Sequence, residues 1–180
     1  MLKMTWDYNA YATELPELFR DVFTASEGKE EGAVISALVS DLLETTDRDD
    51  LHGAIAHDGP QLLGCILFSR LRFDQDPRQV FLMSPVAVRT DRQKAGIGQR
   101  LIAFGLGELR RDKVDFVVTY GDPNYYGKTG FFPISEKVAQ APLPLSHPHG
   151  WLGQSLTGAE MAPFKASSHC VSAFNKPELW

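Results

Sequence analysis

The spacing of apolar side chains predicts two amphipathic helices in the first quarter of the chain. In the first, apolar residues recur at the intervals that line one face of a helix: Leu15, Leu18, Phe19, Val22 and Phe23. A second pattern of the same kind covers residues 34–43. Pro16 suits the first turn of a helix. We expect Gly28 and Gly32 to end the first helix and let the second begin.

From residue 52 the pattern changes to that of strands. Residues 52–58 and 62–72 flank Gly59 and Pro60, a pair typical of a turn, and therefore predict an antiparallel hairpin. Residues 80–88, VFLMSPVAV, are too continuously apolar for a strand with one face in water. They predict a central strand of a sheet.

Helical spacing returns over residues 96–113, with Gly105 and Gly107 as costly positions that tight packing on a sheet would explain. Residues 115–120 then predict a short strand. A strand, a helix and a strand in this order make 80–88 and 115–120 parallel neighbours. With a last strand in SSHCVSAF near the C-terminus, the chain is expected to be an α/β protein with a mixed sheet.

Composition narrows the class of protein. The chain has 180 residues, of which 43% are hydrophobic and 23% charged, as in a single globular domain spanning 1–180. Its net charge of −5 argues against nucleic-acid binding. No apolar run approaches the roughly 20 residues that a membrane span needs, so we expect a cytoplasmic protein without a membrane partner. Cys65 and Cys170 are expected to be small buried residues, with no disulfide framework and no cysteine zinc site.

One turn between a strand and a helix has a sequence suited to anions. Residues 93–98, Gln-Lys-Ala-Gly-Ile-Gly, are here called the glycine turn. Unpaired N–H groups at the start of the following helix could hold a pyrophosphate that glycines allow to approach. A tight turn without a ligand explains the same residues equally well. The Rossmann pattern fails because Leu101 stands where its third glycine belongs, and no Gly-Lys-Ser/Thr tripeptide completes a Walker loop.

A second turn follows the strand at 115–120. Residues 121–131, GDPNYYGKTGF, are here called the tyrosine turn. Both turns follow parallel strands and so belong to one sheet edge, where open α/β sheets bind ligands. Tyr126 lies four residues before Gly130 and Phe131. A packed aromatic side chain remains the alternative explanation for Tyr126, and the favoured one for Tyr125.

Together the two turns resemble the motifs of GNAT N-acetyltransferases. Residues 85–98 resemble the acetyl-coenzyme A motif, Q/R-x-x-G-x-G/A, and Tyr126 with Gly130-Phe131 resembles the tyrosine-x-x-x-glycine-phenylalanine signature. The tyrosine turn, with Ser26-Glu27-Gly28, is similar to the YhbS-like subgroup of predicted acetyltransferases. The strong part of the resemblance covers about 80–134, and the element order, with C-terminal strands about 150–175, extends it over most of the chain.

The resemblance implies the GNAT acyl-CoA N-acyltransferase fold. This is a mixed, mostly antiparallel sheet with a splayed parallel strand pair and helices on both faces. It also implies transfer of an acetyl group from acetyl-CoA to a primary amine by direct attack in a ternary complex, without a metal. Backbone N–H groups near Val86, Ala87 and Val88 would bind the acetyl end of the cofactor. The pyrophosphate would bind the turn residues Gln93, Lys94, Ala95, Gly96, Ile97 and Gly98.

Tyr126 matches the family's general acid, which protonates the departing thiolate. Two positions depart from the family pattern. Thr119 stands where many members have an asparagine that contacts the cofactor, and Asn124 is a nearby substitute. Residues 2–6 are the one candidate for the family's first strand, and they are poorly marked.

Several residues are candidates for the base that would deprotonate the amine. Glu27 is the first candidate, because such enzymes place the link between their first two helices beside the acceptor. Charge at a helix N-terminus is the alternative for Glu27, and the favoured role for Glu30 and Glu31. The other candidates are Asp122, His147 and His149.

Two other function classes stay open. A GNAT-fold module could hold acyl-CoA as a regulatory ligand without turnover, or an unrelated nucleotide-binding protein could use the glycine turn. The acceptor is expected to be a small-molecule or peptide amine, and the acidic composition favours a cationic one. A homodimer through a strand edge near the C-terminus is one candidate for the oligomeric state.

Overall fold

The computed structural model describes residues 1–180, and its internal contacts divide the chain into two compact units. The first unit comprises residues 1–68 and 85–105, and the second comprises residues 69–84 and 106–180. Each unit is described by itself. That the whole chain acts as one domain stays a prediction.

The first unit holds one end of a mixed sheet, in the order β1-β2-β3-β4. The strands are β1 Lys3–Thr5, β2 Leu51–Asp58, β3 Gln61–Phe73 and β4 Val80–Val88, the last two continuing into the second unit. The hairpin predicted around Gly59 and Pro60 is confirmed, with Gly59 at φ +58°. The poorly marked first strand is present too, since β1 pairs antiparallel with β2 and Met4 lies opposite Ala56.

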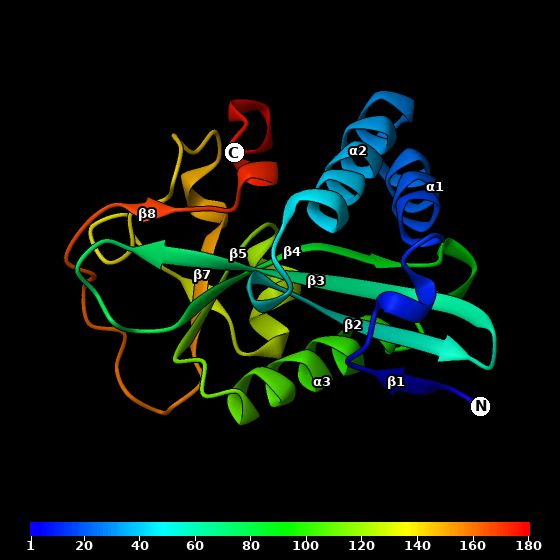
Figure 1. The fold of residues 1–180 in the computed structure, drawn as a ribbon, viewed down its shortest axis with the longest axis horizontal. Helices are drawn as coiled ribbons and strands as arrows, with labels where there is room; N and C mark the ends of the chain where they lie inside the picture. Colours follow the sequence, from blue (N-terminus) through cyan, green and yellow to red (C-terminus); the bar gives the residue numbers. More distant parts are fainter. The chain divides into compact units, whose positions relative to one another are not determined.

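Two helices, α1 (Leu15–Glu27) and α2 (Lys29–Thr45), lie side by side on one side of β2 and β3, with α3 (Ile97–Arg111) on the other (Figure 1). Gly28, at φ +100°, ends α1 as predicted. The break predicted at Gly32 is wrong, because Gly32 lies inside α2. There a Cβ atom would come within 2.0 Å of the Thr24 hydroxyl, so this glycine serves the close packing of α2 on α1.

The glycines of α3 differ from each other. A Cβ atom on Gly105 would lie 2.6 Å from the Phe68 ring and 3.5 Å from Ala54. The predicted tight packing of the helix on the sheet is therefore confirmed at Gly105. Gly107 has no neighbour within 4 Å of such a Cβ atom, and packing does not explain it.

The second unit continues the sheet in the order β4-β5-β7-β6, with β8 paired to β3. Its further elements are β5 Phe116–Tyr120, α4 Pro123–Tyr126, β6 Phe132–Pro133, β7 Trp151–Ser155 and β8 Ser168–His169. Strands β4 and β5 are parallel, as predicted, and β7 is antiparallel to β5. The last strand predicted in SSHCVSAF is shorter than expected, because Ser172–Phe174 form a 3-10 helix.

Both cysteines were expected to be buried, and one of them is. Cys65 is fully buried in β3, where burial raises the pKa of its thiol. Cys170 is partly exposed, because the chain leaves β8 after His169 instead of continuing as a central strand. Both are free thiols.

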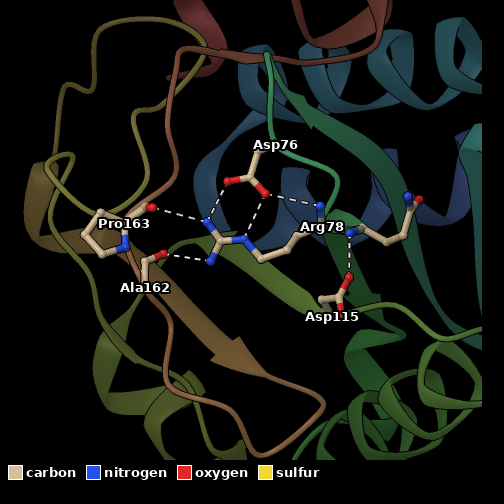
Figure 2. A network of polar contacts seen from close by, with 6 residues as sticks. Asp76, Arg78, Asp115, Ala162 and Pro163 are labelled. Carbon is tan, nitrogen blue, oxygen red and sulfur yellow. Dashed lines mark hydrogen bonds and ion pairs between the residues drawn. The ribbon is translucent and has the colours of Figure 1, made fainter.

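An arginine in the loop between β3 and β4 connects distant parts of the second unit (Figure 2). The Arg78 guanidinium donates to both carboxylate oxygens of Asp76, at 2.9 and 2.7 Å. It also donates to the carbonyls of Ala162 and Pro163, at 2.7 and 3.2 Å, and lies 3.8 Å from the centre of the Phe164 ring. The loop after β7 is thereby fixed to the start of β4.

Candidate functional site

The glycine turn exposes its backbone just before α3. Residues 93–96 are exposed, and a 3-10 helix over Thr90–Arg92 leads into them. Lys94 and Gly96 have φ values of +64° and +75°. Left-handed residues in a turn can direct successive N–H groups toward one concave side, a known form of anion site. The first N–H groups of α3 add donors that have no partner within the helix.

The space and charge at this turn suit a pyrophosphate. A Cβ atom built on Gly96 would meet nothing within 4 Å, so a ligand can come close to the backbone. Three cationic side chains, Arg92, Lys94 and Arg100, belong to the turn or flank it. In a chain with a net charge of −5, this is a local excess of positive charge. The residues present therefore fit a pyrophosphate group.

A hydrogen bond to β3 fixes the orientation of the backbone just before the glycine turn. The Arg89 N–H donates to the Leu63 carbonyl at 2.8 Å. Because alternate residues of a strand point their N–H groups to opposite sides, those of Val86 and Val88 point away from β3. The Gln93 side chain donates to the Val88 carbonyl at 3.1 Å and ties the glycine turn to this strand end.

In the tyrosine turn, local contacts fix the ring of Tyr126. The Asp122 carboxylate accepts from the Asn124 N–H at 2.9 Å and begins α4. A Cβ atom on Gly121 would lie 2.7 Å from the Tyr126 ring, so the ring lies directly over this glycine. Phe131 packs against Tyr126 with ring centres 6.0 Å apart.

Two further hydrogen bonds hold the Tyr126 backbone to β7. The Thr129 hydroxyl donates to the Tyr126 carbonyl at 2.8 Å. The Gln154 side chain of β7 donates to the Thr129 carbonyl at 3.0 Å. Its amide also lies 3.0–3.2 Å from the position of a Cβ atom on Gly130, which has φ +95°. The glycine of the tyrosine turn therefore serves both a left-handed conformation and the close approach of Gln154.

Burial raises the pKa of the Tyr126 phenol well above its usual value of 10.0, and Tyr125 and the Asp122 carboxylate raise it further. The phenol is therefore protonated at neutral pH. In this state it is a donor and can act as an acid, not as a base.

An acidic groove of about 530 Å³ lies in the first unit. Its carboxylates belong to Glu14, Glu17, Asp21 and Asp91, and its apolar lining to Leu18, Val22 and Leu62. Arg89 is the cation of the groove and binds Asp91 at 3.0 Å, which holds the pKa of that carboxyl below its usual value. The remaining carboxylates leave the groove with net negative charge.

Comparison with known proteins places this geometry in a family. The fold is similar to that of YhbS, a GNAT family N-acetyltransferase from Escherichia coli solved in complex with CoA, with a TM-score of 0.79 and 22% identity over 98% of this chain and 92% of that chain. A GNAT family acetyltransferase from Brucella melitensis, in complex with acetyl-CoA, has a TM-score of 0.66 and 22% identity over 97% and 99% of the two chains.

The sequence is also 33% identical over 129 residues to YjhQ of E. coli K12, named as an uncharacterized N-acetyltransferase, which covers 69% of this chain and 71% of YjhQ. The chain belongs to the GNAT family of N-acetyltransferases. No protein-family model matches the sequence.

The structure gives the other candidate residues of this GNAT protein specific places. Glu27 is the exposed last residue of α1, whereas Glu30 and Glu31 lie in the first turn of α2. Glu27 directly precedes Gly28, the N-cap of α2, so all three carboxylates lie at or near the start of that helix. Asp122 is the N-cap of α4, where its side chain accepts a hydrogen bond from the Asn124 N–H.

The two histidines lie in an exposed loop with their rings 5.9 Å apart. They are His147 and His149, and the backbone N–H of His147 donates to the Tyr120 hydroxyl at 2.6 Å. Asn124 is exposed at the start of α4. No group of three or more His, Cys, Asp or Glu side chains could hold a metal ion, and no helix has the length and apolarity to cross a membrane.

Sequence reasoning missed the residues that hold the candidate site in place. Gln154 lies in a strand, WLGQS, with no motif that marks it as a contact of the tyrosine turn. Thr119 did carry a signal, since it replaces an asparagine of the family pattern. Its side chain, 1% exposed, donates to the Met83 carbonyl of β4.

Proposed function

We propose that this GNAT protein transfers an acetyl group from acetyl-CoA to a primary amine of a small molecule or peptide, by direct attack in a ternary complex. The observation that carries the proposal is the glycine turn, with exposed backbone, a glycine at φ +75° and open space above it. The CoA and acetyl-CoA complexes of the structurally similar GNAT proteins support the choice of cofactor.

In this proposal the chain binds the cofactor mainly through backbone donors. The N–H groups of residues 93–98 take the pyrophosphate, with Lys94 and Arg100 adding positive charge. Those of Val86 and Val88, which point away from β3, orient the thioester end. Acetyl-CoA supplies the acyl group on a sulfur that leaves as a thiolate.

Tyr126 is proposed to hold the proton that the leaving sulfur needs. The phenol oxygen gives up its proton as the carbon–sulfur bond breaks, and regains one from solvent afterwards. A phenol with a raised pKa is a weak acid toward a thiolate whose ordinary pKa is about 8.5. A thiolate bound beside the buried phenol would also have its pKa raised by burial, which would narrow the difference between the two pKa values.

The acidic groove supports a cationic acceptor. Its carboxylates match a protonated amine, and its apolar lining suits the carbon body of such a molecule. A protonated amine must lose a proton before it attacks. Glu27, exposed at the end of α1, is proposed for this step on the family resemblance, and it is not among the residues that line the groove.

A panel of primary amines, assayed by the release of free thiol from acetyl-CoA, tests the proposal. Turnover of at least one amine, with cofactor binding measured separately by calorimetry, is the expected result. Tight cofactor binding without turnover of any amine would favour the regulatory binding module instead. Absence of CoA binding would remove both. The cytoplasmic location and the homodimer stay predictions of the sequence.

A further inference from the structure

One loop of the second unit is fixed to the end of β5 at two points. We call residues 146–150, between β6 and β7, the histidine loop. The His147 N–H donates to the Tyr120 hydroxyl at 2.6 Å, and the Gly121 N–H donates to the Gly150 carbonyl at 3.0 Å. A hydrogen bond of 2.8 Å from the Gly150 N–H to the His147 carbonyl closes the loop into a single turn. The histidine loop is therefore held to the backbone that leads into the tyrosine turn.

Gly121 lies against both this loop and the proposed acid. A Cβ atom on Gly150 would come within 2.9 Å of the Gly121 carbonyl oxygen. A Cβ atom on Gly121 would come within 2.7 Å of the Tyr126 ring. Neither contact leaves room for a side chain, so a shift of the histidine loop would displace the glycine on which the ring rests.

The hydrogen-bond roles of the Tyr120 hydroxyl follow from its neighbours. The Ser146 hydroxyl donates its single proton to the Trp180 carbonyl at 2.6 Å. It therefore accepts at its 3.2 Å contact with the Tyr120 hydroxyl, and Tyr120 is the donor there. Because the Tyr120 oxygen also accepts from the His147 N–H, a directed chain of hydrogen bonds runs from the loop backbone through two hydroxyls to Trp180.

The residue at the end of this chain is held on several sides. Trp180 is 4% exposed, and its indole N–H donates to the Phe174 carbonyl at 2.8 Å. Its ring stacks on that of Tyr120, with ring centres 6.2 Å apart and 20° between the planes. The Ser146 N–H also donates to the Trp180 carbonyl, at 3.2 Å. Tyr120 is thus fixed through both its ring and its hydroxyl.

We propose that Tyr120 is a positioning residue for Tyr126: its hydroxyl chain holds the histidine loop and Gly121, and with them the ring of the acid. The inference rests on the proposed function, since it assumes that Tyr126 protonates the leaving sulfur. The residues involved all belong to the second unit. Gln154 holds the backbone of the tyrosine turn, whereas the Tyr120 chain holds the glycine under the phenol ring.

Tyr120→Phe tests the hydroxyl while it keeps the stacked ring. We expect kcat to fall about five- to tenfold, because a loosely held acid spends less time in the productive geometry. Kd for acetyl-CoA should stay within about twofold, since the glycine turn keeps its contacts. In the Tyr126→Phe background the same substitution should change kcat little. Tyr11→Phe is the control, because it loses a hydroxyl bond of 3.2 Å to the Gly59 carbonyl in the first unit and should leave kcat unchanged.

Ser146 offers an independent break in the same chain. Ser146→Ala removes the second hydroxyl and should reproduce the fall in kcat. Ser146→Thr keeps a hydroxyl and should restore kcat to within about twofold of the wild type. Equal losses in these two variants would assign the effect to packing and overturn the inference, as would an unchanged kcat in Tyr120→Phe.

NMR of the free protein gives a readout that does not depend on turnover. The ring current of Tyr126 shifts the Hα resonances of Gly121, so these report how the ring lies on the glycine. The ring-current shift should shrink in Ser146→Ala and be retained in Ser146→Thr, and an unchanged shift in Ser146→Ala overturns the inference. A wild type that turns over no amine would instead remove the proposed function, and with it the acid that Tyr120 is inferred to position.

Discussion

The glycine turn and the tyrosine turn both follow strands, yet they differ in what they offer a ligand. Residues 93–96 present exposed backbone, and the left-handed conformations of Lys94 and Gly96 shape it. The tyrosine turn instead holds one side chain, Tyr126, whose ring rests on Gly121 and whose backbone is tied to β7. A binding role can thus depend on backbone shape alone, whereas a catalytic role needs a side chain and the contacts that support it.

The largest effect should come from filling the glycine turn. Gly96→Glu places a side chain at φ +75°, at a cost of about 1–2 kcal/mol, and a carboxylate where a pyrophosphate would lie. Calorimetry should show a loss of acetyl-CoA affinity of at least about 100-fold.

Gly158→Glu is the matched control. Gly158 has φ +77° and equally open space around it, but lies in the loop after β7. It should carry the same backbone strain and bind acetyl-CoA as the wild type does. Equal affinity losses in both variants would show that strain, and not the anion site, is responsible.

The next effect should fall on turnover and not on binding. Tyr126→Phe removes the proposed acid and keeps the ring over Gly121, so kcat should fall about 100-fold or more while Kd for acetyl-CoA stays within about twofold. Thiol-release kinetics beside calorimetry separate the two quantities. Tyr125→Phe, at the neighbouring 37% exposed ring, should leave kcat unchanged. An unchanged kcat in Tyr126→Phe would show that Tyr126 is not the acid. The tyrosine turn would then have no catalytic role to contrast with the binding role of the glycine turn.

The two turns also differ in how far the sequence predicted them. The helix and strand on either side of the glycine turn followed from apolar spacing, and the open approach at its glycines from the motif. The left-handed conformations of Lys94 and Gly96 were not predicted. The position of Tyr126 was predicted too. Its supporting contacts were not, because Gln154 is 28 residues further along the chain and meets the turn through strand pairing that no local pattern encodes.

The wrong predictions about the fold also come from contacts between residues far apart in the sequence. Gly32 was expected to break a helix, which is the usual local meaning of glycine, but close packing on Thr24 decides its place. The segment SSHCVSAF was expected to be a strand, but only two of its residues, Ser168 and His169, pair with β3 and form β8. Local spacing predicts that an element exists, and contacts far along the chain decide where it ends.

A smaller change in kcat should follow from loosening the tyrosine turn. Gln154→Leu removes the donor to the Thr129 carbonyl, and with it the tie between Tyr126 and β7. We expect kcat to fall about five- to tenfold, because a loosely held acid spends less time in the productive geometry. In the Tyr126→Phe background the same substitution should change kcat little, since the group it positions is gone. Full additivity of the two effects in steady-state kinetics would show that Gln154 acts elsewhere.

The smallest effect on function should come from the Arg78 network, which touches neither turn. The hydrogen bonds that the Asp76 carboxylate accepts from Arg78 lower the pKa of Asp76 to about 2. Since the folded pKa lies below the unfolded value of about 3.9, the ion pair stabilises the fold above about pH 4 and loses this contribution as the pH falls toward 2. Asp76→Asn should therefore lower the free energy of unfolding at pH 7 by about 1–2 kcal/mol and by much less near pH 2.

Urea unfolding at several pH values measures this difference, with Asp74→Asn as the control. Asp74 is 58% exposed in its pair with His169, so its loss should cost no more than about 0.5 kcal/mol. Acetyl-CoA affinity should be unchanged in both variants, because the Asp76 side chain bonds to Arg78, and the further hydrogen bonds of that guanidinium go to the loop after β7. A weaker cofactor complex in Asp76→Asn would mean that binding depends on more than the backbone of the glycine turn, and the contrast drawn between the two turns would then be wrong.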